Sequence, residues 1–132
     1  MRLSVCIVSW NTCGYLRECL TSLLAYPPAG DEIEVIVVDN ASSDGSAEMA
    51  AGEFPSVILL AETTNLGYAE GNNLALERAT GDALLLLNPD VVVYPDVPHA
   101  RRIATAVRRG LFRDSGELRV TATTSTYDSA RW

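Results

Sequence analysis

The chain contains no lysine, and all ten of its basic residues are arginines. A phosphate-binding P-loop needs a lysine that reaches the phosphates, so that class of nucleotide site is excluded. Cysteine is also scarce, because Cys6, Cys13 and Cys19 form an odd set without a C-x-x-C pair. His99 is the one histidine that could complete a soft metal site. We therefore expect the three thiols to be small buried side chains in a reducing compartment.

Long apolar stretches are missing as well. The longest runs, such as residues 35–38 and 83–87, fall far short of the roughly 20 residues that cross a bilayer, so no transmembrane segment is expected. The N-terminus enters a β-branched strand almost at once and has no small-residue cleavage site, which argues against a secretory signal. We expect a cytoplasmic chain, with the inner face of the membrane as an alternative. A length of 132 residues suits one domain with a real core.

Charge is distributed unevenly along the chain. Residues 1–98 contain 3 arginines and 14 acidic residues, a net charge of −11, whereas residues 99–132 contain 7 arginines and 3 acidic residues, a net charge of +4; together these give −7. We therefore expect a folded unit over residues 1–98 and a basic tail over residues 99–132. We interpret the tail as a frame-shifted or truncated end, with a basic partner-binding tail as the alternative. Apolar residues at helical spacing predict a helix over residues 99–109.

The first unit alternates strand and helix patterns. Short apolar runs rich in β-branched residues and leucine are typical of strands buried on both faces, and helices between them indicate parallel crossovers. The predicted fold class is therefore α/β, with a doubly wound, mostly parallel sheet. Asn11 or Thr12 is expected to cap the first helix. The predicted strands cover residues 3–9, 33–38, 57–61 and 83–87. The first predicted helix begins after Thr12, and two further helices cover residues 46–54 and 68–79.

The loop after the second predicted strand indicates a ligand site. Asp39 and Asp44 lie there among small hydroxyl and glycine residues, at the carboxyl end of a buried parallel strand, where open α/β sheets bind ligands. Carboxylates accept hydrogen bonds from a ribose or a base, and a buried Asp39 is costly unless something donates to it. A dinucleotide-binding or methyltransferase site is disfavoured, because Gly14 is the single glycine in the turn after the first strand.

Four motifs follow one another along the first unit. They are Val8-Ser9-Trp10-Asn11, Val37-Val38-Asp39-Asn40-Ala41-Ser42-Ser43-Asp44-Gly45-Ser46, Asn65-Leu66-Gly67-Tyr68-Ala69 with Gly71-Asn72-Asn73, and Leu85-Leu86-Leu87-Asn88-Pro89-Asp90. In this order they resemble the motifs of the family 2 glycosyltransferases, and within that family those of the bacterial rhamnosyltransferase-like branch. The resemblance covers roughly residues 3–98. It implies the nucleotide-binding half of a GT-A fold, which is Rossmann-like and binds a nucleotide-sugar at the carboxyl ends of its strands.

The resemblance also implies roles for individual residues. Ser9 and Asn11 would line the base pocket, Asp39 would accept a hydrogen bond from the base, and Asp44 would flank the nucleoside. Asn65, Gly67 and Asn73 match the motif that approaches the nucleotide, although Asn73 has an alternative role in tying down the neighbouring loop. Asn88-Pro89-Asp90 stands where the family has D-x-D. Asp90 and Asn88 would therefore hold Mg²⁺ or Mn²⁺, with a neutral carbonyl from Asn88 in place of the first acid.

The activity that the resemblance implies is an inverting transfer of a sugar from a nucleoside diphosphate to a growing cell-surface glycan or a lipid-linked acceptor. Rhamnose is the sugar that the branch suggests. No nucleic-acid partner is expected. No catalytic base is assigned, because nothing beyond residue 98 matches the family's general base. The alternative interpretation is a catalytically inactive, truncated fragment that only binds nucleotide, and a Rossmann-type methyltransferase is a more remote one.

Overall fold

The structure is a computed structural model that describes residues 2–26, 32–93, 113–114 and 117–118. The helix predicted over residues 99–109 and most of the basic tail lie outside these ranges. The elements in chain order are β1 (Arg2–Ser9), α1 (Cys13–Ala25), β2 (Glu32–Asp39), α2 (Ser46–Glu53), β3 (Ile58–Ala61), α3 (Gly67–Arg78), β4 (Ala83–Leu87), β5 (Arg113–Asp114) and β6 (Glu117–Leu118). The two short strands β5 and β6 pair with each other in antiparallel fashion.

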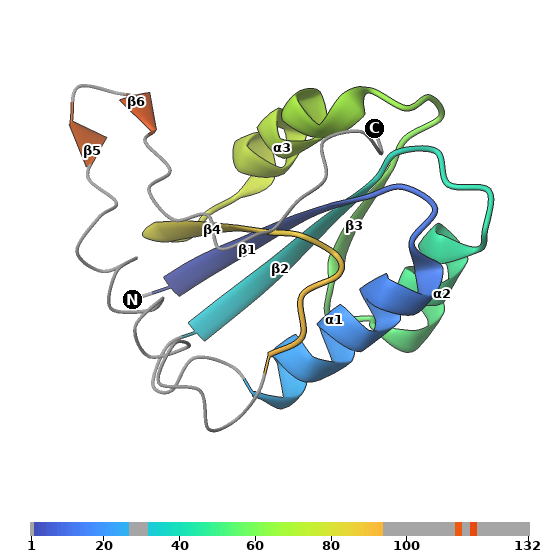
Figure 1. Ribbon diagram of the computed structural model, residues 1–132. Coiled ribbons are helices and arrows are strands. Elements are labelled where there is room, and N and C mark those ends of the chain that lie inside the picture. The colour runs from blue at the N-terminus through green and yellow to red at the C-terminus, as the bar shows by residue number, and fades with distance from the viewer. Residues whose placement is uncertain (1, 27–31, 94–112, 115–116, 119–132) are drawn as a thin grey trace.

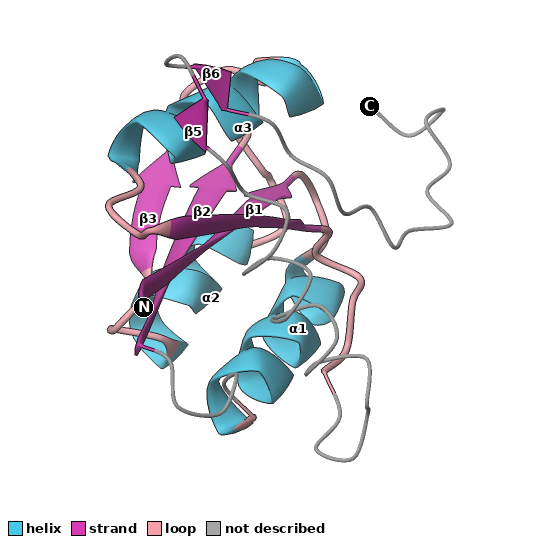
Figure 2. Cartoon of the chain, turned by 90° about the vertical axis from the view of Figure 1, so that its left-hand side faces the viewer, coloured by secondary structure: helices cyan, strands magenta, loops and turns pink. Residues whose placement is uncertain are grey.

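The four longer strands form one parallel sheet in the order β3-β2-β1-β4. Helices α1 and α2 cover one face and α3 covers the other, as Figures 1 and 2 show. In the register of the sheet Ser9 lies opposite Asp39, and Asp39 lies opposite Ala61. The carboxyl ends of β1, β2 and β3 are therefore level, so the loops that follow them share one edge of the sheet. This arrangement confirms the predicted α/β, doubly wound fold class.

Side chains that alternate along each strand build two apolar layers. Val5 and Ile7 of β1 pack toward α1 and α2, where they meet Leu20, whereas Cys6 and Val8 pack toward α3. All five are almost inaccessible to solvent. Burial of a leucine such as Leu20 contributes about 2 kcal/mol to stability. Because both faces of the sheet are covered, the strands carry continuous apolar runs instead of an apolar–polar alternation.

One buried carboxylate interrupts the apolar pattern at the amino end of β2. Glu34 is 7% exposed and accepts hydrogen bonds from the hydroxyl of Ser4 and from the backbone N–H of Thr80, the latter at 2.6 Å. Arg2 adds an ion pair at 3.2 Å. A side chain at Gly81 would collide with this cluster, since its Cβ would lie 2.5 Å from the Ser4 hydroxyl. The cluster ties the start of β4 to β1 and β2 at the edge of the sheet opposite the level loops.

Most predicted boundaries agree with the structure to within one residue. β4 covers the predicted residues 83–87, whereas β3 begins at Ile58 and α2 ends at Glu53. α3 begins at Gly67, one residue earlier than predicted, because Asn65 accepts the N–H of Gly67 and opens the helix there. The longest described helix is α1, with 13 residues. None of the described helices is long and apolar enough to cross a membrane.

Candidate functional site

Two loops at the carboxyl ends of β1 and β2 are joined by reciprocal hydrogen bonds. The backbone N–H of Asn11 donates to the hydroxyl of Ser42 at 2.9 Å, and the N–H of Ser43 donates to Oδ1 of Asn11 at 2.8 Å. Asn11 (φ 50) and Ala41 (φ 59) both lie in the left-handed region. Alanine in particular adopts this conformation only at a cost, and such strain gathers at functional sites. The two loops therefore form one rigid surface at this edge of the sheet.

Asp39 is the last residue of β2, where one of these loops begins, and it is 2% exposed. Its Oδ2 accepts the backbone N–H of Ser42 at 2.9 Å. Its Oδ1 is buried and has no hydrogen-bond partner among the described residues. A buried acceptor without a donor costs roughly 1–3 kcal/mol, which a ligand N–H would recover. The structure thus gives Asp39 the property expected of a ligand-binding carboxylate, while its role toward a base stays a prediction.

Asp44, in contrast, has both carboxylate oxygens paired. Oδ2 accepts the N–H of Cys13, the first residue of α1, at 2.9 Å, and Oδ1 accepts the N–H of Ser46, the first residue of α2, at 3.1 Å together with its hydroxyl. Burial alone would raise the pKa of Asp44, but these hydrogen bonds outweigh it and hold the pKa below its ordinary value. One carboxylate therefore accepts backbone N–H groups at the amino ends of two helices.

The prediction for the cap of α1 is right in position and wrong in its hydrogen bond. Thr12 occupies the cap position but makes no capping hydrogen bond, because its hydroxyl lies 2.8 Å from the hydroxyl of Ser9. Asn11 uses its side-chain oxygen for Ser43 instead. Ser9 is fully buried, so its hydroxyl is committed to this contact within the loop. Asn11 is exposed, and its amide nitrogen has no partner among the described residues.

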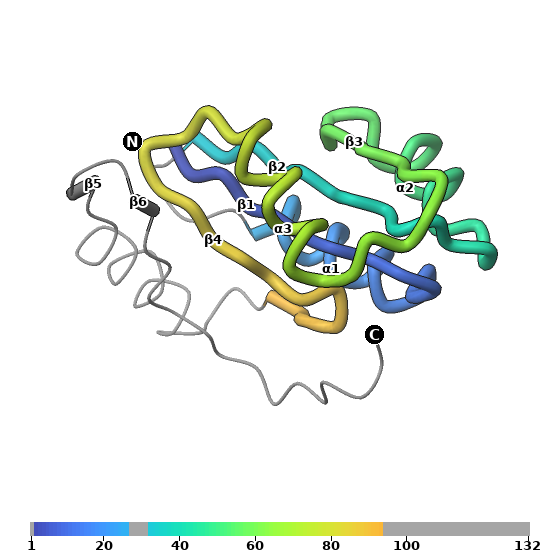
Figure 3. The backbone as a smooth tube through the Cα atoms, turned by 90° about the horizontal axis from the view of Figure 1, so that it is seen from above, coloured from blue at the N-terminus to red at the C-terminus, as the bar shows by residue number. Residues whose placement is uncertain are grey.

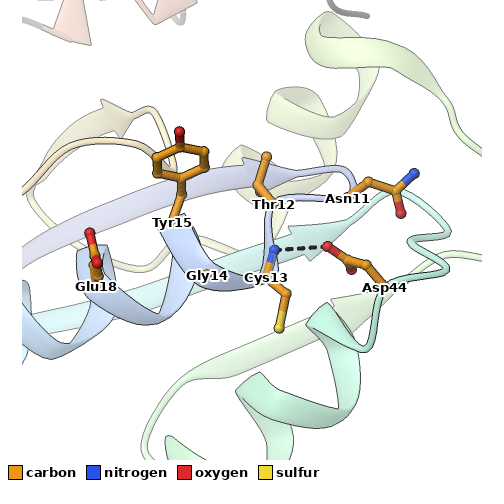
Figure 4. A pocket seen from close by; sticks show the side chains of 7 residues that line it. All are labelled: Asn11, Thr12, Cys13, Gly14, Tyr15, Glu18 and Asp44. Carbon is orange, nitrogen blue, oxygen red and sulfur yellow. Dashed lines mark hydrogen bonds between the residues drawn. The ribbon is translucent and has the colours of Figure 1, made fainter.

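An open pocket of about 360 Å³ lies beside the first turn of α1. Figure 4 shows Asp44 reaching across to the backbone of Cys13 at its rim. Asn11 and Asp44 are the predicted site residues that line the pocket, and Asp39 is not among the lining residues. Cys13 is only partly buried, contrary to the expectation that all three thiols are enclosed. The lining residues are Asn11, Thr12, Cys13, Gly14, Tyr15, Glu18 and Asp44.

The loop between β3 and α3 brings two further predicted residues to the same edge. Oδ1 of Asn65 accepts the N–H of Gly67 at 2.8 Å, and Gly67 adopts φ 83, which favours glycine. Asn40, which the sequence did not single out, holds this loop from β2: its amide nitrogen donates to the carbonyl of Gly67 at 2.9 Å. The feature of the sequence that could have pointed to Asn40 is its position next to Asp39, at the end of a buried strand.

Asn73 is not brought together with the other predicted residues by any contact. Its side chain is exposed on α3 and donates to Glu70 of the same helix at 3.4 Å. The alternative expectation, that Asn73 ties down the neighbouring loop, is therefore wrong. Asn72 is the buried one of the pair, and it donates to the carbonyl of Tyr68 one turn earlier at 3.0 Å.

The turn after β4 presents two oxygen donors that could hold a cation. Asn88 is 8% exposed, and its Oδ1 accepts the hydroxyl of Tyr68 at 3.3 Å, whereas Asp90 is exposed. Burial and the nearby charge of Asp90 raise the pKa of Cys19 to about 12. Within the described ranges, no three His, Cys, Asp or Glu side chains are grouped so that they could hold a metal ion. The two oxygens fit Mg²⁺ or Mn²⁺ when a ligand supplies more, as nucleotide phosphates do.

Comparison with known proteins defines the class to which this fold and site belong. Residues 4–109 match glycosyl transferase family 2, and the chain belongs to that family. The match runs past the expected boundary at residue 98. The chain is 36% identical over 100 residues to YfnE, an uncharacterised glycosyltransferase of Bacillus subtilis, and 33% identical over 97 residues to YibD, an uncharacterised glycosyltransferase of Escherichia coli. These alignments cover 74% and 71% of this chain, but 25% and 27% of the two relatives.

Solved structures show the same architecture. A mannosyltransferase from Pyrobaculum calidifontis, in complex with GDP-Man and Mn²⁺, has a TM-score of 0.66 at 29% identity over 80% of this chain and 31% of its own. TarS from S. aureus, residues 1–349 in complex with UDP, has a TM-score of 0.67 at 25% identity over 83% of this chain and 32% of its own. The chain thus spans about a third of the length of these structures.

Proposed function

We propose that this chain is the donor-binding part of an inverting glycosyltransferase. It binds a nucleoside diphosphate sugar at the carboxyl edge of the sheet, in the cytoplasm, and the sugar passes to a hydroxyl of a cell-surface glycan or lipid-linked acceptor. Rhamnose is the specific sugar that we propose. The observation that carries the proposal is the buried, unpartnered Oδ1 of Asp39 at the end of a central parallel strand.

The loop geometry supports a nucleoside beside Asp39. A carboxylate can only accept, so Oδ1 selects a ligand that presents an N–H or O–H group, as the ring N–H of uracil, thymine and guanine does. The exposed amide nitrogen of Asn11 offers a donor on the neighbouring loop. Asp44 contributes by holding the amino ends of α1 and α2 in place, which fixes the walls of the pocket. Asn65 and Gly67 lie at the same edge of the sheet, in the loop between β3 and α3, where they are joined by a hydrogen bond.

The residues that would hold a divalent cation are Asp90 and Asn88. Both supply hard oxygen donors, and Asp90 supplies the one charge of the pair. A bound Mg²⁺ or Mn²⁺ would stabilise the negative charge that grows on the nucleoside diphosphate leaving group. The similar structure from Pyrobaculum calidifontis is a complex with GDP-Man and Mn²⁺, which supports the use of a divalent cation together with the nucleotide-sugar.

We also propose that residues 1–98 form the donor-binding unit and that residues 99–132 are a separate basic tail. The reversal of net charge at this point, from −11 to +4, supports the division. Limited proteolysis tests it: cleavage is expected within residues 110–132 well before the first unit is cut. Equal resistance of the two segments would contradict the division.

Isothermal calorimetry tests the proposed donor binding. The chain would be titrated with uridine, guanosine and thymidine diphosphates, each with and without Mn²⁺. We expect weak, saturable binding of at least one of them, because the base and ribose contacts lie in this chain while the rest of the donor pocket does not. Absence of binding to all three, by a chain shown to be folded, would contradict the proposal.

A further inference from the structure

Asn40 is fully buried at the point where three segments of the site meet. Its backbone N–H donates to the carbonyl of Ser9 at 2.8 Å, which continues the pairing of β1 with β2. Its side-chain nitrogen donates to the carbonyl of Gly67 at 2.9 Å, and its Oδ1 accepts the N–H of Leu66 at 3.4 Å. One residue therefore links the ends of β1 and β2 to the first turn of α3.

The side chain at this position must both donate and accept. Gly67 offers a carbonyl and Leu66 offers an N–H, and a carboxamide is the short side chain that satisfies both. An aspartate has the same shape, but it would set an oxygen against the carbonyl of Gly67 and bury a second charge beside Asp39. Asn40→Asp thus removes the hydrogen bond to Gly67 with almost no change in volume, and it keeps an acceptor for the N–H of Leu66.

An independent feature shows how closely α3 approaches this point. A Cβ atom at Gly71 would lie 2.8 Å from Cγ1 of Val8 and 3.3 Å from the amide nitrogen of Asn40. The first of these distances is shorter than two carbon atoms tolerate, so a side chain at Gly71 would push the helix away. Seen from above, α3 lies across β1 and β2, as Figure 3 shows. The hydrogen bonds of Asn40 and the lack of a side chain at Gly71 therefore set the same distance, that between α3 and the ends of β1 and β2.

We propose that Asn40 is a positioning residue for the nucleotide site. It makes no contact with the ligand itself; it holds the Asn65–Gly67 segment at a fixed distance from Asp39, so that both are in place when a nucleotide arrives. The inference rests on the proposed donor binding. It extends that function, because it assigns the spacing of the two loops to one buried carboxamide and to the absence of a side chain at Gly71.

The experiment compares Asn40→Asp and Gly71→Ala with two controls in the full 132-residue chain. Gly52→Ala is the matched control for the added methyl group, since nothing lies within 4 Å of a Cβ built there. Leu23→Ala controls for lost stability, because this buried residue lies at the far end of α1. Each variant is measured for affinity toward uridine, guanosine and thymidine diphosphates by calorimetry, and for hydrogen exchange of the Leu66 and Gly67 amides by NMR.

We expect both variants to weaken nucleotide binding about tenfold and to speed exchange of the Leu66 and Gly67 amides. Asn40→Asp sets an oxygen against the carbonyl of Gly67, and Gly71→Ala pushes α3 away, so each change loosens the segment that carries these two amides. Gly52→Ala and Leu23→Ala should change neither when measured well below their melting temperatures. Equal weakening in Leu23→Ala would overturn the positioning role, as would exchange at Leu66 and Gly67 that stays unchanged in Asn40→Asp. If the parent chain binds none of the nucleotides, the proposed function fails, and the exchange rates still decide whether Asn40 holds the loop.

Discussion

The carboxylate of Asp44 caps a helix that begins 31 residues earlier in the chain, since its Oδ2 accepts the backbone N–H of Cys13 at 2.9 Å. The same side chain holds the first residue of α2 through Oδ1. The amino ends of both helices on one face of the sheet therefore depend on one loop. Asp39 directly precedes that loop, so the stability of the helices and the shape of the ligand site are linked.

Replacing Asp44 with alanine should lower the free energy of unfolding by about 1–2 kcal/mol, the usual cost of removing a helix cap. Urea denaturation followed by circular dichroism measures it. Glu77→Gln is the control, because Glu77 is exposed on α3 and has no hydrogen bond or ion pair to a described residue. An Asp44→Ala variant as stable as Glu77→Gln would show that the contact with Cys13 contributes nothing.

Glu34 should make stability depend on acid pH. Burial raises the pKa of Glu34, but hydrogen bonds from Ser4 and Thr80 and the charge of Arg2 outweigh it and set the pKa below its ordinary value of 4.5. A carboxyl whose pKa is lowered by folding stabilises the protein above its ordinary pKa, and this contribution is lost as the pH falls through the folded-state value.

Glu34→Gln should therefore be less stable than the parent at about pH 7, and the difference should shrink as the pH falls below about 4.5. Urea denaturation at a series of pH values gives the comparison. A difference between parent and variant that stays constant down to about pH 3 would contradict a lowered pKa for Glu34.

The three thiols should differ in reactivity. Burial, followed by the charge of Glu34, raises the pKa of Cys6 to about 12, and burial with the charge of Asp90 does the same for Cys19. The thiolate is the reactive form, so neither should react with a disulfide reagent in the native chain at neutral pH. Cys13 is partly exposed and should react. One thiol per chain is expected before unfolding and three after it, and native labelling that survives Cys13→Ser would contradict this assignment.

The turn after β4 should govern the effect of metal on nucleotide binding. Asp90→Asn should abolish any gain in affinity that Mn²⁺ brings, because it removes the one charge of the pair. Asn88→Asp should enlarge the gain by adding a second hard anionic donor. Calorimetry with and without Mn²⁺ measures both. An Asn88→Asp variant with the metal response of the parent would count against direct coordination by this side chain.

The sequence predicted the strands well because each consists mainly of apolar residues between turn residues. β4 matches its predicted range, and the carboxyl edge that carries Asp39 follows from the parallel order of such strands. The cap of α1 could not be predicted in this way. Thr12 occupies the cap position, but Asp44 from another loop accepts the helix N–H in place of the Thr12 side chain. A contact across 31 residues leaves no periodic signal in the chain.

The contacts of Asn40 could not be predicted from the sequence for a related reason. Its partners, Leu66 and Gly67, lie on the next loop along the sheet, and burial of a polar side chain becomes visible only when those partners are in place. In the sequence Glu34 is only a polar residue that interrupts a strand. In the structure it accepts hydrogen bonds from Ser4 and Thr80 and forms an ion pair with Arg2. Local patterns predict which elements form, whereas polar contacts between distant segments need the packed structure.

The most direct test of the account is to map a bound nucleotide on the chain. Backbone amide shifts in a ¹⁵N-labelled sample would be followed as the tightest-binding nucleoside diphosphate is added. We expect the largest shifts at Asn11, at residues 40–44 and at Gly67, all at the carboxyl edge of the sheet, and we expect Asp39→Ala to abolish them. Shifts centred on Arg2, Glu34 and Thr80 at the opposite edge, or unchanged binding by Asp39→Ala, would contradict the site proposed for the donor.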